Sequence, residues 1–365
     1  MNDSKTTPSA PVFVRIYSSL KQRVEAEEWN FGAMLPSEIE LSEIYQASRG
    51  TVRQALAQME KEGLVSRERG RGTFITYSHL KRPLTNLDSR SISFIVPYVR
   101  DSFVASILLG LEREARHNKY AVFFSHFEND PEKQELALRS ALERQVNGIV
   151  LYPVNSKTIS PTLLKLIKEK FPLVLIDRYI RGLDTDYVTS DNFSGGLVAT
   201  QHLLRLGHTQ IAFLGWTENA TSITHRLAGY RQALQEAGVT PQPCLEWEVV
   251  GYPVVDQPDL EKRLSEPERP SAVFAANDQL AMAVHRAARA IQLSIPNDLA
   301  LVGFDNLDIS AHLDIPLTTI AQPAFEMGQV AWELLSFRFL SEPAYTQKRL
   351  LPVQLIVRRS CGTIQ

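Results

Sequence analysis

The stretch from Ser48 to Ile75 constrains this chain more than any other, because a helical apolar pattern is followed directly by a cationic turn. Apolar residues recur at i, i+3, i+4 and i+7 in its first half, at Val52, Ala55, Leu56 and Met59. This spacing predicts a helix with one apolar face that docks on the rest of the protein. The opposite face carries small and hydrogen-bonding residues, which suits a surface that approaches a duplex.

Two arginines border the predicted exposed face. Arg49 and Arg53 lie four residues apart, so their side chains fall near one another on the helix. Ser48 has the chemistry of an N-cap, and the positive helix end beside it favours a phosphate group. Because one arginine can bond guanine O6 and N7 together, worth about 1–3 kcal/mol of base discrimination, these residues predict a DNA-recognition helix.

A basic hairpin is expected after this helix. Gly63 is expected to end the helix, and Leu64–Arg67 and Thr73–Tyr77 have strand-type composition on either side of the turn RERGRG. This pattern predicts a two-stranded hairpin with cationic side chains projecting from its tip, those of Arg67, Arg69 and Arg71. Such arginines would supply salt-dependent affinity for phosphates.

Two more helices are expected upstream. Apolar residues recur at helical spacing over Val12–Trp29, and LPSEIELSEIYQ begins a helix for which Ser37 is the expected cap. From Ser48 to Thr73 six cationic residues stand against three acidic ones, whereas the whole chain has a formal net charge of -2. The basic character is therefore local. Periodicity alone also allows a small helical domain whose arginines are merely solvated.

Roughly residues 11–76 resemble the winged helix-turn-helix of the gluconate-repressor (GntR) family. The resemblance is carried by the segments LPSEIELSE, SRGTVRQALAQMEKEGLV and GRGTF. The resemblance implies DNA contacts from eight residues, namely Ser37, Ser48, Arg49, Thr51, Arg53, Arg69, Arg71 and Gly72. Arg49, Thr51 and Arg53 would contact bases and phosphates, and the wing around Gly72 would enter the minor groove. Ile39 departs from the family pattern, because many members have a polar or basic residue there. One backbone or base contact is therefore expected to be absent.

Length and composition bound the rest of the chain. A chain of 365 residues with 44% hydrophobic content has room for roughly two to three domains. No apolar run approaches the roughly 18 residues of a membrane span, and the first ten residues have no apolar core, so a cytoplasmic protein is expected. Cys244 and Cys361 lack metal-type spacing and the histidines form no HxxxH or HExxH pattern, so neither a metal nor a cofactor is predicted.

The remainder alternates between strand-type and helix-type segments. Residues 78–90 are polar, contain Pro83 and lack sustained periodicity, which predicts a linker between a domain at 11–77 and another at 91–365. Strand candidates then occur at residues 91–99, 120–127, 148–154, 171–179, 187–191, 210–216, 247–252, 271–278 and 299–305, with helical stretches between them. The alternation predicts parallel βαβ units arranged as two α/β lobes.

Polar residues follow several of these strands: Asp177-Arg178, Asn277-Asp278, Asp305-Asn306 and Gln322. Ligands of open parallel sheets bind outside the carboxyl ends of the strands. Such groups, facing one another across a cleft, could hold a small polar molecule by its hydroxyls. The alternative is that strand ends are simply where polar residues emerge.

Five segments of this region resemble the effector domain of lactose-repressor-type regulators, which is related to periplasmic sugar-binding proteins. The segments are DYVTSDNFSGGLVATQHLLRLGHTQIAFLG, HRLAGYRQALQEAG, FAANDQLAMAV, LALVGFDN and PLTTIAQP. The resemblance spans roughly residues 91–360 and implies two lobes joined by three crossovers. It implies effector contacts from Arg226, Asn277 and Asp305, less firmly from Asp177, Arg178 and Gln322, and from the aromatic Phe103.

Simpler roles remain open for these residues. Arg226 could pair with a surface acid, and Phe103 could belong to the core. Asp177 and Arg178 could form a salt pair that bridges the lobes. Trp216 is a candidate stacking platform for a sugar ring, although core or rim packing is the stronger interpretation.

The combination of both resemblances is similar to the bacterial arabinose repressors of the AraR kind. It implies a repressor that binds a palindromic operator as a homodimer and is released by a small sugar. A purine or nucleoside effector, and corepression in place of release, are open alternatives. An enzyme is not predicted, since NFSGG is not the GxSxG nucleophile elbow. A transport-type binding module would leave the wing unexplained.

Overall fold

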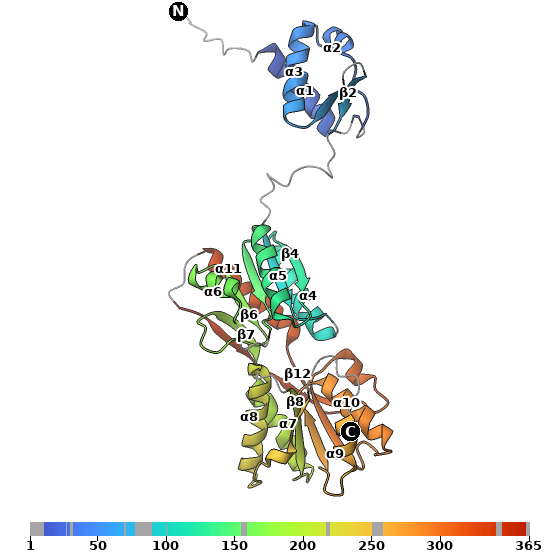
Figure 1. Ribbon diagram of the computed structural model, residues 1–365, viewed down its shortest axis with the longest axis vertical. Coiled ribbons are helices and arrows are strands. Elements are labelled where there is room, and N and C mark those ends of the chain that lie inside the picture. Colours follow the sequence, from blue (N-terminus) through green and yellow to red (C-terminus); the bar gives the residue numbers. More distant parts are fainter. Residues whose placement is uncertain are drawn as a thin grey trace, which may run out of the picture. The chain divides into compact units, whose positions relative to one another are not determined.

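The computed structural model describes residues 11–26, 28–29, 32–68, 71–76, 90–99, 101–154, 159–216, 220–249, 258–340 and 345–362. Two units divide the chain, Met1–Ser89 and Arg90–Gln365 (Figure 1). Arg69 and the predicted linker segment 78–89 lie outside the described residues. Within the described part, no helix is both long and apolar enough to cross a membrane.

The first unit consists of three helices and a hairpin: α1 (Val12–Glu25), α2 (Glu38–Ile44), α3 (Arg49–Lys61), β1 (Val65–Glu68) and β2 (Gly72–Ile75). The strands pair antiparallel, with Val65 opposite Ile75. The apolar stripe predicted on α3 forms the centre of the core, because none of its four side chains is more than 1% exposed. Val12, included in the stripe predicted for α1, is instead exposed.

Local signals set where the helices begin and end. Ser37 and Glu40 form a capping box at the start of α2, each side chain bonding the backbone N–H of the other residue. Ser48 Oγ accepts the Thr51 N–H at 3.2 Å and caps α3. Gly63 has a φ of 71°, a left-handed conformation that allows the chain to leave the helix.

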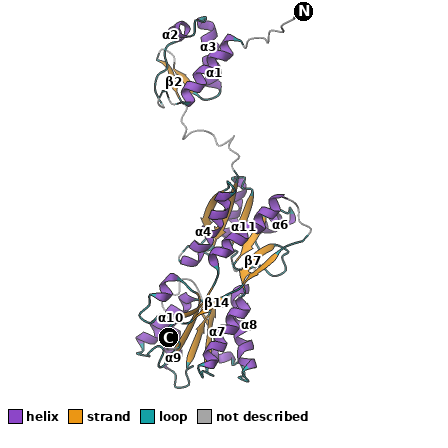
Figure 2. Cartoon of the chain, turned by 180° about the vertical axis from the view of Figure 1, so that it is seen from behind, coloured by secondary structure: helices purple, strands orange, loops and turns teal. Residues whose placement is uncertain are grey.

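The second unit has two lobes, each built on a six-stranded sheet. Lobe 1 contains β3 (Ser91–Val96), β4 (Ala121–His126), β5 (Gly148–Leu151), β6 (Leu173–Ile176), β7 (Asp186–Ser190) and β13 (Lys348–Leu351). Its helices are α4 (Ser102–His117), α5 (Pro131–Glu143), α6 (Pro161–Lys168) and α11 (Ala324–Leu340). The strand order is β13-β7-β6-β5-β3-β4, all parallel. Helices α4 and α11, which lie side by side in Figure 2, cover one face of the sheet, and α5 and α6 cover the other.

Lobe 2 repeats this plan. Its strands are β8 (Ile211–Trp216), β9 (Glu246–Val249), β10 (Ala272–Ala275), β11 (Ala300–Asp305), β12 (Thr318–Ala321) and β14 (Gln354–Ile356). Its helices are α7 (Asn192–Arg205), α8 (Thr221–Glu236), α9 (Pro258–Ser265) and α10 (Asp278–Ala290), with short 3-10 turns η2 (Pro243–Leu245) and η3 (Asp308–Ala311). The order is β14-β12-β11-β10-β8-β9. The edge strand β14 is antiparallel, a departure from the predicted all-parallel alternation.

The chain passes between the lobes three times, between β7 and α7, between β12 and α11, and between β13 and β14. The three crossovers implied by the resemblance are therefore present. The elements α11, β13 and β14, which complete this exchange, were not among the predicted strands and helices. The helical patterns LVATQHLLRLG and RLAGYRQALQEAG predict helices that begin at Leu197 and Arg226, whereas α7 and α8 begin earlier, at Asn192 and Thr221, because their first turns carry polar residues.

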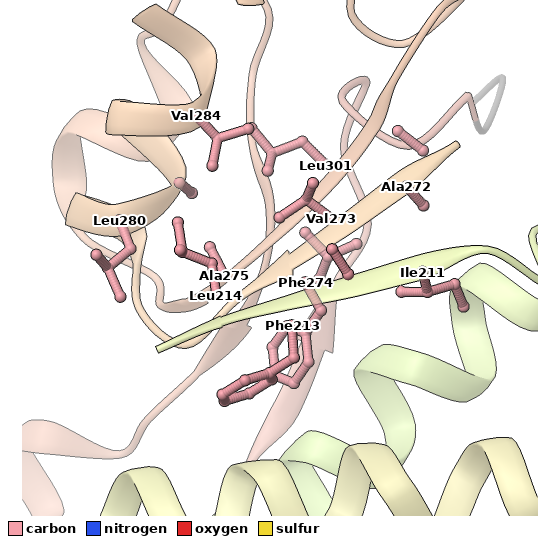
Figure 3. Packing of buried hydrophobic residues seen from close by; sticks show 14 of the residues in the cluster. Ile211, Phe213, Leu214, Ala272, Val273, Phe274, Ala275, Leu280, Val284 and Leu301 are labelled. Atoms are coloured by element: carbon pink, nitrogen blue, oxygen red, sulfur yellow. The ribbon is translucent and has the colours of Figure 1, made fainter. Parts of the chain in front are cut away.

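Close packing fixes α8, which carries Arg226, in lobe 2. On the sheet, Phe213 of β8 and Phe274 of β10 meet edge to face with ring centroids 5.4 Å apart, and Leu280 and Val284 of α10 belong to the same core (Figure 3). Helices α7 and α8 contact at glycines. A Cβ on Gly229 would lie 2.1 Å from the Phe193 carbonyl oxygen, so a glycine is required there.

Candidate functional site

Residues at the carboxyl ends of both sheets line one cavity between the lobes. Its empty space measures about 880 Å³, part of which is open to solvent. All seven residues predicted to bind an effector line it: Phe103, Asp177, Arg178, Arg226, Asn277, Asp305 and Gln322. The strand-end polar residues are therefore brought together, as expected for parallel sheets that face one another.

Arg226 of α8 is held rigidly on the lobe 2 side. Its Nε donates to Asn192 Oδ1 at 2.7 Å, and its Nη1 donates to the Ala276 carbonyl at 2.6 Å. Nη1 also lies 3.6 Å from Asp305 Oδ1, and the guanidinium stacks 3.6 Å from the Phe304 ring centroid. The side chain is only 3% exposed. The alternative that Arg226 pairs with a surface acid is wrong, because its acidic partner is buried inside the cavity wall.

Asp305 is placed by an unusual backbone conformation at the end of β11. Its φ of 111° is costly for a residue other than glycine, and Gln322 Nε2 donates to its Oδ1 at 2.7 Å. Burial raises the pKa of Asp305 well above its ordinary value, against the opposing effect of Arg226. Asn277, which lines the cavity, caps α10 because its side-chain oxygen accepts the Leu280 N–H at 2.9 Å.

Lobe 1 contributes a second buried guanidinium. Arg178 lies 4.5 Å above the Tyr152 ring, and its Nε is 3.8 Å from Asp177 Oδ2. Asp177 has a left-handed φ of 66°. Both residues belong to the end of β6, so their ion pair stays within lobe 1 and the lobe-bridging alternative is wrong. Phe103 packs in the lobe 1 core, which is the simpler role considered for it, and it also lines the cavity.

Three polar atoms of cavity residues have no hydrogen-bond partner in the described structure: Arg178 Nε, Asn129 Oδ1 and Gln322 Oε1. Buried polar groups are nearly always paired, so unpaired ones in the wall of a cavity are available to bond a ligand or water. One of these atoms is a donor and two are amide oxygens that accept. A ligand that offers several hydroxyl groups satisfies both kinds.

Several cavity residues were not predicted, namely Tyr98, Asp101, Asn129, Tyr152 and Gln279. Tyr98 lies two residues after β3 and Tyr152 directly follows β5, so the strand-end rule would have found them. Burial raises the pKa of both tyrosines, which keeps their hydroxyls protonated. Trp216 packs against the lobe 2 core, which is the stronger interpretation given for it, and it also lines the cavity.

Direct hydrogen bonds join the two lobes beside the cavity. Gln279 Nε2 donates to Asp101 Oδ2 at 2.9 Å. Tyr179 N–H donates to Thr221 Oγ1 at 3.1 Å, and the same hydroxyl lies 3.2 Å from the Tyr179 carbonyl oxygen. Tyr179 directly follows Arg178, and Thr221 begins the helix that carries Arg226. This contact therefore couples the segments that hold the two buried guanidiniums.

Asp278 organises the loop that follows Asp305. Its carboxylate is fully buried and accepts hydrogen bonds from Ser310 Oγ, Thr319 Oγ1 and the Leu307 N–H at 2.5, 2.6 and 2.8 Å. Burial raises its pKa from 3.8 to about 6, although these hydrogen bonds oppose the rise. The residue thus links α10, β12 and η3 behind the cavity wall.

In the first unit, acidic residues engage the predicted DNA-contacting arginines. Arg53 of α3 makes a forked ion pair with Glu38, and Arg67 of β1 pairs with the same carboxylate. The expectation that Arg67 projects from the hairpin tip is wrong, because the side chain turns back to α2. Arg71 pairs with Glu68 at 2.6 Å.

The other predicted DNA contacts lie on or near the exposed surface of the first unit. Ser48, Arg49 and Gly72 are exposed, and Thr51 is half-buried with its hydroxyl 2.8 Å from Ser48 Oγ. Ser37 is committed to the capping box. Ile39, the departure from the family pattern, is 50% exposed on the first turn of α2.

Comparison with known proteins assigns both units. Residues 13–75 match the gntR family of bacterial regulatory proteins, and residues 200–361 match the periplasmic binding protein-like domain. The arabinose metabolism transcriptional repressor of Geobacillus stearothermophilus is 31% identical over 309 residues, covering 82% of this chain and 84% of that repressor. The chain belongs to this family of transcriptional repressors. The predicted combination of domains, and the prediction of a regulator instead of an enzyme, are confirmed.

Other relatives of this repressor support the same family assignment. The ribose operon repressor of Escherichia coli strain K12 is 28% identical and covers 77% of this chain and 85% of its own length. A solved LacI family transcriptional regulator from Enterococcus faecium, with bound ribose, is 25% identical with a TM-score of 0.65 and covers 76% of this chain and all of that one. The two-lobed fold is therefore shared with a LacI family regulator that binds ribose.

Replacing Asp278 by Asn should alter how the repressor's stability depends on pH. The pKa of Asp278 is raised in the folded state, so the folded protein retains a proton that the unfolded chain releases, and stability is lost as pH rises toward 6. A change from 3.8 to about 6 corresponds to about 3 kcal/mol. Between pH 3 and 7, the free energy of unfolding of the wild type should fall by about this amount relative to Asp278→Asn. Urea unfolding at several pH values measures it, and parallel pH profiles would contradict it.

Replacing Thr221 by Val should favour an open cleft, since the isosteric change removes the hydroxyl that bonds both Tyr179 backbone groups. Small-angle scattering of the protein without ligand should show a larger radius of gyration, with little change in unfolding midpoint. Thr224→Val is the matched control, because the Thr224 hydroxyl bonds only the Ala220 carbonyl of its own helix end. Equal scattering from both variants would show that Thr221 does not hold the lobes together.

Proposed function

We propose that this repressor binds operator DNA as a homodimer through its first unit and is released when a small sugar binds between the lobes. The gathering of seven predicted polar and aromatic residues in one cavity, with buried polar atoms left unpaired, is the observation that carries this proposal. Relatives named for arabinose metabolism and for the ribose operon, and a neighbour with bound ribose, support a monosaccharide. On this proposal the protein acts in the cytoplasm, where bacterial DNA lies.

The charges of the cavity favour an uncharged ligand. Three carboxylates, of Asp101, Asp177 and Asp305, line it together with the guanidiniums of Arg178 and Arg226. When all are ionised, three negative and two positive charges leave a net charge of -1, and the raised pKa values of Asp101 and Asp305 bring the sum closer to zero. A sugar phosphate would add negative charge to this buried space, which is unfavourable. The hydroxyl groups of a neutral sugar can instead accept hydrogen bonds from the guanidiniums and donate hydrogen bonds to the carboxyl groups, and its ring can stack on the aromatic side chains.

The proposed DNA contacts come from the start of α3 and from the hairpin. Arg49, Thr51 and Arg53 would face the major groove beside the Ser48 cap, where the positive helix end favours phosphate. Arg71 and Gly72 lie at the described part of the wing. Arg53 and Arg71 are already positioned by acidic partners in the same unit. Binding would therefore begin from an ordered surface.

A second copy of the chain would cover the edge of lobe 1. Strand β4 ends the sheet, and its side chains Phe123 and Phe124 are 41% and 37% exposed. Leu109 of α4 is 61% exposed. An exposed apolar edge strand is normally covered by another element.

Two copies of the chain would place two DNA-binding units on a pseudo-palindromic site, and closing of the lobes by ligand would change the spacing of these units. A shift of this equilibrium from 1:99 to 99:1 needs about 5.5 kcal/mol of differential ligand binding.

A thermal-stability screen of the purified protein tests the proposal with pentoses, hexoses, disaccharides, sugar phosphates, nucleosides and purines. A neutral sugar at 100 times its dissociation constant should add about 2.7 kcal/mol of stability. Arg226→Ala should abolish this effect. Arg231→Ala on the same helix should retain it, because Arg231 pairs with Glu246 away from the cavity. Gln322→Ala provides a second cavity variant if Arg226→Ala does not fold.

The same ligand should then weaken binding of the wild type to a duplex selected from a random DNA pool. If only nucleosides stabilise the protein, its effector is a nucleoside and not a sugar. Stabilisation that survives in both cavity variants would place the ligand elsewhere. Tighter DNA binding in the presence of the sugar would make the ligand a corepressor.

A further inference from the structure

Glu38 is the acidic centre of the proposed DNA-binding surface. Its carboxylate accepts from Arg53 Nε at 3.2 Å and from Arg53 Nη2 at 2.8 Å, and it also pairs with Arg67 Nη2. These partners come from α3 and from β1, so one side chain of α2 connects the recognition helix with the wing. The Glu38 side chain is 19% exposed, whereas that of Arg53 is 62% exposed. The acid therefore lies beneath the arginine and leaves it accessible.

The backbone holds Glu38 in this position. It is the first residue of α2, directly after the Ser37 cap, and the reciprocal Ser37–Glu40 bonds fix this helix start. The hydrogen bond from Arg53, with the charges of Arg53, Arg67 and Arg49, lowers the pKa of Glu38. The carboxylate therefore stays ionised at neutral pH.

The ion pair uses one edge of the Arg53 guanidinium and leaves another. Glu38 binds the side edge, formed by Nε and Nη2, and Nη1 has no partner among the described residues. A guanidinium carries five N–H groups in a rigid plane. The end edge, formed by Nη1 and the second proton of Nη2, can therefore donate two parallel bonds to guanine O6 and N7 while Glu38 stays bound.

We propose that Glu38 is a positioning residue that fixes Arg53 for reading one guanine in each half-site, and that it makes base choice at that position depend on α2. The inference rests on the proposed function only in assuming that α3 reads DNA. A fixed guanidinium loses little conformational entropy when it binds the base, whereas a mobile guanidinium can also bind phosphates and other bases. Glu38 also lowers the local positive charge, which weakens binding to any duplex regardless of sequence.

The test is selection from a randomised double-stranded DNA pool by the full-length protein, followed by sequencing. The variants are Glu38→Gln, Glu38→Asp, Arg53→Ala and the double variant Glu38→Gln/Arg53→Ala. Glu43→Gln is the matched control, because it removes one negative charge from the same helix and Glu43 makes no ion pair in the described structure. Unfolding midpoints of all variants establish that they fold.

Glu38→Gln should lose the guanine preference at the position that Arg53→Ala also loses, with about a tenfold fall in discrimination, and should bind a nonselected duplex more tightly at low salt. The double variant should match Arg53→Ala at this position. Glu38→Asp keeps the charge but withdraws the carboxylate by one methylene, so it should lose the preference without the gain in nonspecific affinity. Glu43→Gln should select the wild-type site.

Two results would overturn the inference. If Glu38→Gln and Glu38→Asp both select the wild-type site, Glu38 only repels phosphates and does not position Arg53. If Arg53→Ala keeps the preference that Glu38→Gln loses, Glu38 acts through another group. A wild-type protein that enriches no sequence would instead contradict the proposed function, and this outcome is distinct because it appears before any variant is compared.

Discussion

The buried guanidinium of Arg226 is the interaction on which the second unit depends. A charge removed from water is tolerated only when it is paired and hydrogen-bonded, and the partners of Arg226 come from α7, from the end of β10 and from the end of β11. These elements must therefore hold one arrangement. The close contact of α7 with α8 at Gly196 and Gly229 contributes to it, because side chains there would force the helices apart. The cavity is consequently formed before any ligand enters.

Both units share a second property, which is that polar groups with a proposed ligand role are already fixed by neighbours. In the cavity, Asp305 is held by Gln322 and lies near Arg226, and the lobes bond directly through Tyr179 and Thr221. On the DNA-binding surface, Glu38 holds Arg53. Such preorganisation reduces the entropy lost on binding. On the proposed function, a ligand that closes the lobes adds to contacts that the protein already makes by itself, and it shifts the equilibrium only by as much as it binds the closed form more tightly than the open one.

Much of the fold followed from patterns that are local in sequence. The α3 stripe is buried because period 3.6 places its residues on one face, and Ser37 and Ser48 cap the helices that they precede. Strand candidates in the second unit matched real strands because buried parallel strands are short apolar runs. Other elements escaped prediction. Helix α11 is apolar around much of its circumference and so lacks a clear face, and β13 and β14 are short strands with polar residues.

The same distinction between local sequence patterns and tertiary structure applies to the candidate cavity. The sequence by itself determined which residues stand at strand ends, and hence that Asn277 and Asp305 would lie at one edge of a sheet, because parallel strands present their carboxyl ends at one edge. The packing of the lobes decided that Asp177, from the other sheet, lines the same cavity. Only the tertiary structure decided what these residues contact. Neither the buried pair of Arg226 with Asp305 nor the return of Arg67 to Glu38 leaves a signal in sequence, because each joins segments far apart in the chain. Their geometry arises from helix packing and strand register, which depend on the whole fold.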